Sequence, residues 1–163
     1  RRRVVMIAVS SEDSGMVFRL PDNTLVYLNK FSKLTYPEKF TDAAHLVHLS
    51  GEAYFEPAVG SNLFVQCHDT RIRAFGSAFN VKGMRDGIVE ISAIDGEIEI
   101  SAENEGYFSP VRIGSGEQLI YDTQIKALTK SKVARKDRWW KKGGFRTFIR
   151  NFFNRIIHPR DTR

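Results

Sequence analysis

The eight residues Leu49-Ser-Gly-Glu-Ala-Tyr-Phe-Glu56 constrain the fold more than any other stretch of this sequence. Their apolar side chains lie too close together to form one stripe of an amphipathic helix, and Gly51 interrupts the run near its start. A strand that enters and leaves a bend accommodates both features, because a glycine inside a strand usually marks a bulge or a sharp turn. The run therefore predicts β structure with a bend at the glycine.

Turn residues divide most of the remaining chain into short β runs. Pro21-Asp22-Asn23 predicts a tight turn between the first two strands of a hairpin, since proline presets φ and asparagine tolerates a left-handed backbone. The segment 31–40 mixes lysines with aromatic residues and contains Pro37, so we expect a connection there. The strands that we expect are Val4–Val9, Val17–Leu20, Leu25–Leu28, Leu46–Leu49, Leu63–Cys67, Arg71–Phe75, Ile88–Ile94, Glu97–Ser101, Val111–Ile113 and Gln118–Tyr121.

The dipeptide Asp95-Gly96 predicts a second hairpin, because this pair favours the type I′ turn. A two-residue loop would place Ala93 opposite Ile98 and Ile91 opposite Ile100. One face of this hairpin would be apolar and the other polar, as in a sheet with one face in the core.

The predicted fold is all-β, with many short antiparallel strands in one domain over residues 1–129. A sandwich, a jelly roll and a β-helical roll all fit this pattern, and no alternation of strands with helices is visible. A chain of 163 residues with 42% hydrophobic residues can bury a sizeable core. Its single cysteine excludes a disulfide within the chain.

The charge of the chain changes sign near residue 130. Residues 1–129 hold 13 Lys and Arg against 17 Asp and Glu, whereas residues 130–163 hold 12 against 2. We interpret residues 130–144 as a basic linker and residues 145–158 as an amphipathic helix that ends before Pro159. Such a tail could contact an anionic membrane surface or a partner protein, or its apolar stripe could pack on the β domain. The tail residues proposed for contact are Trp139, Trp140, Lys141, Lys142, Phe145, Arg146, Phe148, Ile149, Arg150, Phe152, Phe153, Arg155, Ile156 and Ile157.

Three other functional classes find little support in the residue pattern. His45 and His48 are three apart, and this spacing points them to opposite faces of a strand, unlike a metal site of the cupin type. Cys67 and His68 are neighbours on one segment, which does not bring a nucleophile and its base together. The basic residues gather in one terminal segment beside an acidic domain, which argues against a nucleic-acid-binding module. We therefore expect no catalytic residue, no metal, no cofactor and no nucleic-acid partner.

Five short motifs follow one another along the chain: Leu20-Pro-Asp-Asn-Thr24, Leu28-Asn29, Leu34-Thr-Tyr-Pro37, Leu49-Ser-Gly-Glu-Ala-Tyr-Phe-Glu56 and Gly76-Ser-Ala-Phe-Asn-Val81. Their order and spacing resemble those of the FecR domain. The resemblance covers about residues 18 to 123, with Asn23, Pro57, Ser77 and Ser115 replacing the family's usual Gly, Val, Thr and Pro. The family-motif residues are Leu20, Pro21, Asp22, Leu28, Asn29, Tyr36, Pro37, Gly51, Glu52, Tyr54, Phe55, Glu56, Gly76, Phe79, Asn80, Val81, Gly116 and Glu117.

The resemblance implies a non-catalytic sensory domain of an anti-sigma regulator. Such a domain would lie in the periplasm, associated with the inner membrane in the full-length protein. It would relay a signal from a TonB-dependent receptor to an extracytoplasmic sigma factor through protein–protein contact. The alternative from the sequence is a stand-alone envelope protein that its basic tail anchors to a membrane or a complex.

Overall fold

The computed structural model describes residues 3–41, 45–102 and 109–133. The chain divides into two compact units, Arg1–Lys132 and Val133–Arg163, and all but one residue of the second lie outside the described ranges. The described residues form strands and no helix. The strands are β1 (Met6–Ser10), β2 (Met16–Arg19), β3 (Leu25–Leu28), β4 (Lys33–Pro37), β5 (Leu46–Ser50), β6 (Glu52–Glu56), β7 (Phe64–Cys67), β8 (Thr70–Ala74), β9 (Phe79–Gly83), β10 (Ile88–Ala93), β11 (Ile98–Ala102), β12 (Val111–Ile113), β13 (Glu117–Asp122) and β14 (Ala127–Lys132).

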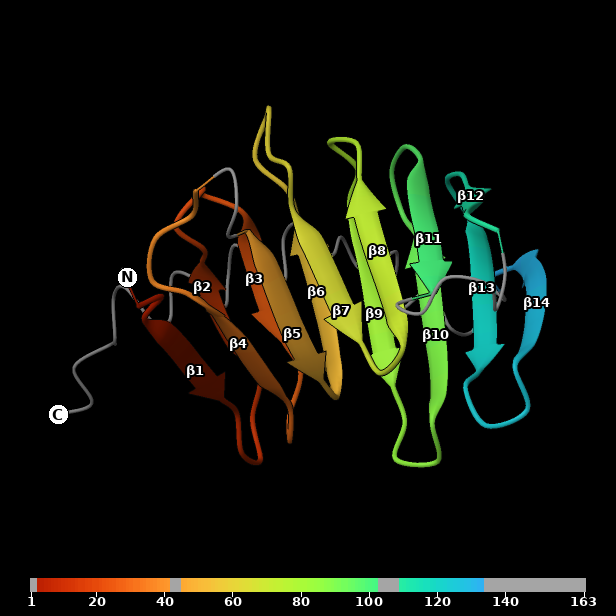
Figure 1. The fold of residues 1–163 in the computed structure, drawn as a ribbon, viewed down its shortest axis with the longest axis horizontal. Helices are drawn as coiled ribbons and strands as arrows, with labels where there is room; N and C mark the ends of the chain where they lie inside the picture. Colours follow the sequence, from red (N-terminus) through yellow and green to blue (C-terminus); the bar gives the residue numbers. More distant parts are fainter. Residues whose placement is uncertain (1–2, 42–44, 103–108, 134–163) are drawn as a thin grey trace, which may run out of the picture. The chain divides into compact units, whose positions relative to one another are not determined.

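The strands of the first unit form two seven-stranded sheets, and in each sheet the strands follow the order of the chain (Figure 1). The first sheet has the order β1-β4-β5-β7-β8-β11-β12, and the second has the order β2-β3-β6-β9-β10-β13-β14. Neighbouring strands are antiparallel, except that β5 and β7 are parallel. Position along the sequence therefore corresponds to position across the sheets, as the colour gradient in Figure 1 shows.

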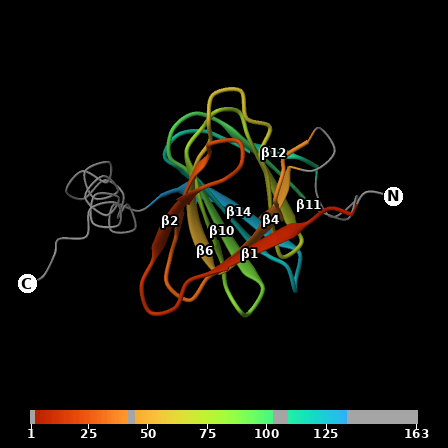
Figure 2. The same ribbon diagram turned by 90° about the vertical axis from the view of Figure 1, so that its left-hand side faces the viewer.

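The chain repeatedly crosses from one sheet to the other, and the core fills the space between them. An end view shows β2 and β6 on one side and β4 and β11 on the other (Figure 2). Both sheets contribute fully buried apolar side chains to a single core cluster, such as Leu34 and Ile72 from the first and Phe55 and Ile91 from the second. The rings of Phe55 and Phe79 stack there with centroids 5.1 Å apart. Inward residues alternate with outward ones along strands such as β5 and β8, as expected for sheets with one face in the core.

Several sequence-based predictions are confirmed. The turn at Pro21 joins β2 and β3 into the predicted hairpin, with Arg19 opposite Leu25. The run around Gly51 forms two strands, β5 and β6, with the glycine between them. Because β5 and β6 belong to different sheets, the bend at this glycine is a crossover between the sheets.

The predicted hairpin at Asp95-Gly96 is wrong. β10 pairs with β9 and β13 in the second sheet, whereas β11 pairs with β8 and β12 in the first. Gly96 has the positive φ of 79° that a tight turn needs, but the turn leads to the opposite sheet. In a hairpin, the apolar faces of β10 and β11 would lie side by side in one sheet. The same apolar pattern is satisfied when the two strands lie in different sheets and their apolar faces oppose each other across the core.

Three strands were missed and one was displaced. β9 (Phe79–Gly83) was not among the expected strands, although it lies in the centre of the second sheet. The segment 31–40, which we expected to be a connection, contains β4, whose Leu34 and Tyr36 are buried. β14 was not expected because five of its six residues are exposed, so no apolar alternation marks it. The first strand is β1, two residues later than Val4.

The strand order narrows the choice of all-β fold. A jelly roll contains Greek keys, in which a strand returns beside one that lies several positions earlier in the chain. The two sheets instead advance in chain order, which agrees with a sandwich or a β-helical roll. The predicted helix at residues 145–158 lies outside the described residues.

Gly51 is placed where only glycine fits. Its φ is 102°, which residues with a side chain rarely adopt. A Cβ there would lie 2.9 Å from the Cα of Ser32 and still closer to its hydroxyl. The glycine thus lets two successive crossovers approach each other.

We predict that Gly51→Ala destabilises the domain far more than Gly76→Ala, which serves as a matched control. Gly76 also has a positive φ, 75°, but a Cβ there would have no neighbour within 4 Å. Strain alone should cost about 1 kcal/mol at Gly76, and strain plus the clash about 3 kcal/mol or more at Gly51. Urea unfolding curves of the two variants test this, and equal midpoints would contradict the close approach.

Candidate functional site

The family-motif residues divide into three groups by location: the core, the outer face of the second sheet, and the turns. The core group consists of Leu20, Leu28, Tyr36, Phe55, Phe79 and Val81. These side chains are buried between the two sheets, and Pro37 is also buried at the end of β4. Their role is to hold the sheets together, so a functional site must be sought among the other two groups.

Glu52 is the centre of the second group. Its carboxylate accepts a hydrogen bond from the side-chain amide of Asn29 at 2.6 Å and another from that of Asn80 at 3.1 Å. The backbone amide of Asn29 also donates to the carbonyl of Glu52 at 2.9 Å. One carboxylate thereby connects the residue after β3, the first residue of β6 and the second residue of β9 on the outer face of the second sheet.

The surroundings of this bridge are mainly buried. Asn80 is only 5% exposed, and its Oδ1 atom has no hydrogen-bond partner among the described residues. Tyr27, Tyr54 and Asn80 lie opposite one another on β3, β6 and β9. Burial, with a smaller contribution from the Glu52 carboxylate, raises the pKa of Tyr27. The Tyr54 hydroxyl donates a long hydrogen bond of 3.4 Å to Glu56, the last residue of this group.

The bridge is suited to holding strands together. Its carboxylate is engaged by two neutral amides. Buried hydrogen bonds to a charged group contribute more than neutral ones, and losing one partner leaves the other unsatisfied. Glu52 and Glu56 thus both have structural contacts in this fold.

The third group lies in the turns. Asp22 follows the exposed Pro21 and accepts hydrogen bonds from the backbone amide of Thr24 at 3.0 Å and from the hydroxyl of Ser61 at 2.5 Å. The contact with Ser61 links the first hairpin to the β6–β7 connection. Gly51 and Gly76 lie at sheet crossovers with positive φ. These motif positions therefore shape the chain where it leaves one sheet for another.

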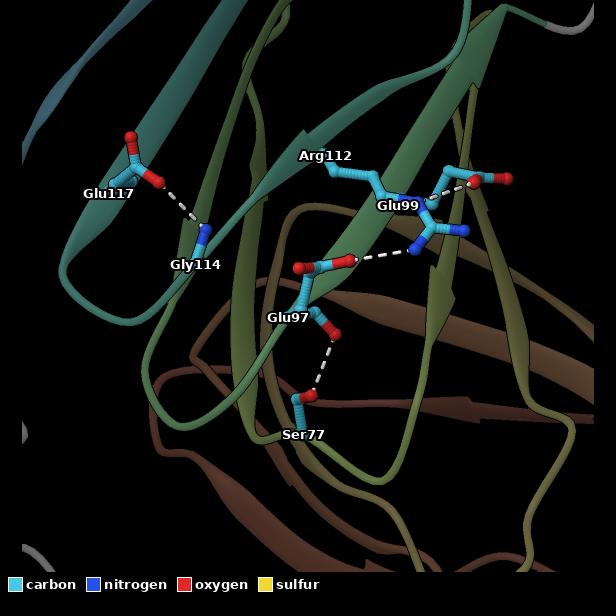
Figure 3. Close-up of polar contacts among 6 residues, drawn as sticks. All are labelled: Ser77, Glu97, Glu99, Arg112, Gly114 and Glu117. Carbon is cyan, nitrogen blue, oxygen red and sulfur yellow. Dashed lines mark hydrogen bonds and ion pairs between the residues drawn. The ribbon is translucent and has the colours of Figure 1, made fainter.

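The crossovers near Gly96 and Gly116 are also tied to each other. The hydroxyl of Ser77 donates to the carbonyl of Glu97 at 2.7 Å (Figure 3). The amide of Gly96 donates to the hydroxyl of Ser115 at 2.8 Å, and the amide of Gly116 donates to the carbonyl of Ala93 at 2.9 Å. Ser77 and Ser115 replace the family's usual threonine and proline, and each hydroxyl makes a specific contact.

Glu117 closes the β12–β13 turn. Its carboxylate accepts a hydrogen bond from the amide of Gly114 at 2.9 Å, as Figure 3 shows, and pairs with Lys130 at 3.1 Å. The Gly114 amide and then Lys130 hold the pKa of Glu117 below its usual value. This residue therefore stabilises a turn rather than presenting a proton-transfer group.

Sequence reasoning missed a group of arginine and aromatic side chains on the outer face of the first sheet. We call Phe64, Arg71, Arg73, Phe75 and Arg112 the Arg–Phe surface. The guanidinium carbons of Arg73 and Arg112 lie 4.9 and 5.0 Å from the centre of the Phe75 ring, and that of Arg73 lies 5.6 Å from the Phe64 ring. The signal in the sequence was the alternation along β8, in which the arginines and Phe75 share the outward parity opposite Ile72 and Ala74.

The residues considered for metal or nucleophilic chemistry do not converge. His48 is exposed on the first sheet, and Nδ1 of His45 contacts the carbonyl of Thr41 at 2.9 Å. No group of three or more His, Cys, Asp or Glu side chains is arranged to hold a metal in residues 3–41, 45–102 and 109–133. Cys67 is buried, and this burial raises the pKa of its thiol to about 12.

The tail residues proposed for membrane or partner contact, from Trp139 to Ile157, lie outside the described residues. Within the part of the chain that the structure describes, no helix has the length and apolar character needed to cross a membrane.

We predict that Glu52→Gln lowers the free energy of unfolding by about 1–3 kcal/mol. The charge is lost, and in the present side-chain orientations the new amide group faces one of the two asparagine amides, so a donor meets a donor. Glu56→Gln is the control, because its one side-chain contact is long and its effect should stay within about 0.5 kcal/mol. Equal losses in the two variants would show that the Glu52 bridge contributes no more to the free energy of unfolding than the single long contact of Glu56.

We also predict that Cys67 resists alkylation by iodoacetamide at pH 8.5 in the folded protein and reacts in urea. The raised pKa keeps the folded thiol protonated, and only the thiolate is nucleophilic. Since the folded pKa lies above the unfolded one, this group contributes stability below about pH 9, and the contribution is lost as pH rises toward 12. Mass spectrometry of labelled protein measures the reaction, and rapid labelling without urea would contradict the burial.

Comparison with known proteins agrees with this architecture. A model of the FecR protein family matches residues 7–99. Two crystal structures from Parabacteroides distasonis ATCC 8503, each provisionally described as an anti-sigma factor, are similar in fold, both at 27% sequence identity. The first has a TM-score of 0.73 over 85% of this chain and 66% of that chain, and the second 0.69 over 77% and 59%.

The chain thus spans less than two thirds of the length of either solved structure. No curated protein gives a significant match. The family match covers more than half of the chain and includes the strands that carry the Asn29–Glu52–Asn80 bridge. On this evidence the chain belongs to the FecR family.

Proposed function

We propose that the β domain is the signal-receiving part of an anti-sigma regulator and works by protein–protein contact without catalysis. The agreement between the family match and the likeness to two anti-sigma structures carries this proposal. The motif residues support it, because those described above have contacts that hold strands and turns in place. The chain would act in the periplasm, with the full-length protein associated with the inner membrane.

The signal would come from a TonB-dependent receptor and reach an extracytoplasmic sigma factor through the regulator. A binding domain can transmit such a signal if receptor contact favours one of two arrangements of the regulator. Its rigid frame of two sheets suits that task, because a contact on one face then shifts the whole domain as a unit. The partners would be the receptor's signalling domain or another component of the sigma pathway.

Crosslinking in native envelopes tests this proposal. The baits are the intact chain and a version that ends at Val133, since β14 continues to Lys132 and a shorter version would cut a paired strand. We expect mass spectrometry to identify a receptor or sigma-pathway component with both baits. The control bait is the Glu52→Gln variant unfolded by heat, and it should recover less of that component. Recovery of no such component by either bait would contradict the proposal.

The basic tail supports a second candidate function, that of an envelope protein anchored to a membrane or a complex. Residues 130–163 carry a formal net charge of +10, whereas residues 1–129 carry −4. Electrostatic attraction to an anionic surface would add to insertion of the Phe and Ile stripe of the tail.

We predict that the intact chain floats with vesicles containing phosphatidylglycerol and that the version ending at Val133 does not. Binding should weaken markedly between low salt and 0.5 M salt, because exposed charges are screened. Vesicles of phosphatidylcholine alone are the control. Flotation that persists both in high salt and without the tail would rule out this anchoring.

A further inference from the structure

We propose that the Arg–Phe surface binds an acidic, extended segment of a protein partner. This inference rests on the proposed function, since it identifies the face through which the domain would make its contact. The surface crosses β7, β8 and β12 on the outer face of the first sheet, far from the Glu52 bridge on the second. Arginine and aromatic residues are the side chains that dominate binding energy at protein interfaces.

Two arginines of this surface, Arg73 and Arg112, already lie against its phenylalanine rings before any partner arrives. Arg73 lies between the rings of Phe64 and Phe75, at 5.6 and 4.9 Å from their centres. Phe75 in turn lies between Arg73 and Arg112 and remains 44% exposed. Stacking on a ring occupies the flat face of a guanidinium and leaves its N–H edges open for hydrogen bonds. A partner would therefore find ordered donors and pay less for ordering them.

The charges of the surface are unevenly balanced. Arg112 is neutralised by Glu97 at 2.8 Å and Glu99 at 3.2 Å (Figure 3). Glu99 also lies opposite Arg73 in the register, but its carboxylate pairs with Arg112. Arg71 and Arg73 have no ion pair with any carboxylate in the described ranges. Two arginines without an ion pair to a described residue thus lie two residues apart on β8, within a domain whose net charge is negative.

The spacing of these two arginines defines the partner. They are alternate residues of one strand, so they point outward about 7 Å apart. Two acidic residues separated by one residue in an extended partner segment have the same spacing, and a carboxylate can accept two parallel hydrogen bonds from a guanidinium. A large apolar side chain next to the second acidic residue would cover the exposed part of Phe75. The surface therefore fits an acidic-x-acidic-aromatic segment.

The test uses fluorescence anisotropy with the full chain. The probe is a fluorescein-labelled nine-residue peptide that contains Glu-Val-Glu-Trp between Ser and Thr residues, and the control peptide has Gln at both Glu positions. Arg73→Gln and Arg71→Gln should each weaken binding of the Glu peptide about tenfold, since each removes a charged hydrogen-bond pair. Arg85→Gln is the matched control, because Arg85 is exposed in the β9–β10 turn and has no ion pair with a described residue.

The proposal predicts that the Gln peptide binds at least tenfold more weakly and that Phe75→Ser weakens binding of the Glu peptide. Protection of Cys67 from alkylation checks that each variant is folded. Equal binding of the two peptides, or an equal loss in Arg85→Gln, would overturn the proposal. It would also be overturned if a twelve-nucleotide single-stranded DNA or phosphatidylglycerol vesicles bound more tightly through Arg71 and Arg73 than the peptide. Failure of the envelope crosslinking alone would contradict the sigma-pathway assignment and leave peptide binding intact.

Discussion

The fold depends on hydrogen bonding between successive crossovers from one sheet to the other. Each crossover exposes backbone groups that no strand can satisfy, and serine hydroxyls and neighbouring turns supply the missing partners. The hydroxyl of Ser11 donates to the carbonyl of Asn29 at 2.5 Å and accepts from the amide of Ser32 at 3.0 Å, while the hydroxyl of Ser32 accepts from the amide of Glu52 at 2.9 Å. The carbonyl of Gly51 then accepts from the amide of Gly83 at 2.8 Å. This series links the β1–β2, β3–β4 and β5–β6 crossovers and ends at Gly83, the last residue of β9. The Glu52 bridge begins at the β5–β6 crossover.

The positions of strands could be predicted from the sequence better than the pairing between them. Short apolar runs and turn residues located most strands, because side-chain alternation and turn chemistry are local properties. Strand pairing is not a local property, as the turn at Gly96 illustrates. The positive φ of Gly96 could be expected from the sequence. Whether Ala93 and Ile98 pair within one sheet or lie in different sheets depends on a core formed by distant strands. β14 was missed since its residues are held by pairing with β13, and pairing leaves no mark on an exposed strand.

The motif residues show a similar division. Their clustering around bends was evident from Gly51, and the family resemblance placed them in an all-β domain that the structure confirms. The convergence of Asn29 and Asn80 on the Glu52 carboxylate could not be predicted, because it depends on the register of three strands. The Arg–Phe surface could not be predicted either, since Phe64 and Arg112 approach the side chains of β8 only once β7 and β11 pair with β8 and β12 pairs with β11.

The chain-ordered arrangement of the sheets affects how the domain would respond to mechanical load. β1 ends one sheet, and β14 ends the other at the opposite end of the series, so tension applied through the two ends of the domain acts first on single terminal strands. Each terminal strand has one neighbour in its own sheet, and detaching it leaves the next strand pair intact. Such a domain yields by sequential peeling from its ends rather than by simultaneous shearing of its whole core. The middle of the series, where the Glu52 bridge lies, would be the last part to give way.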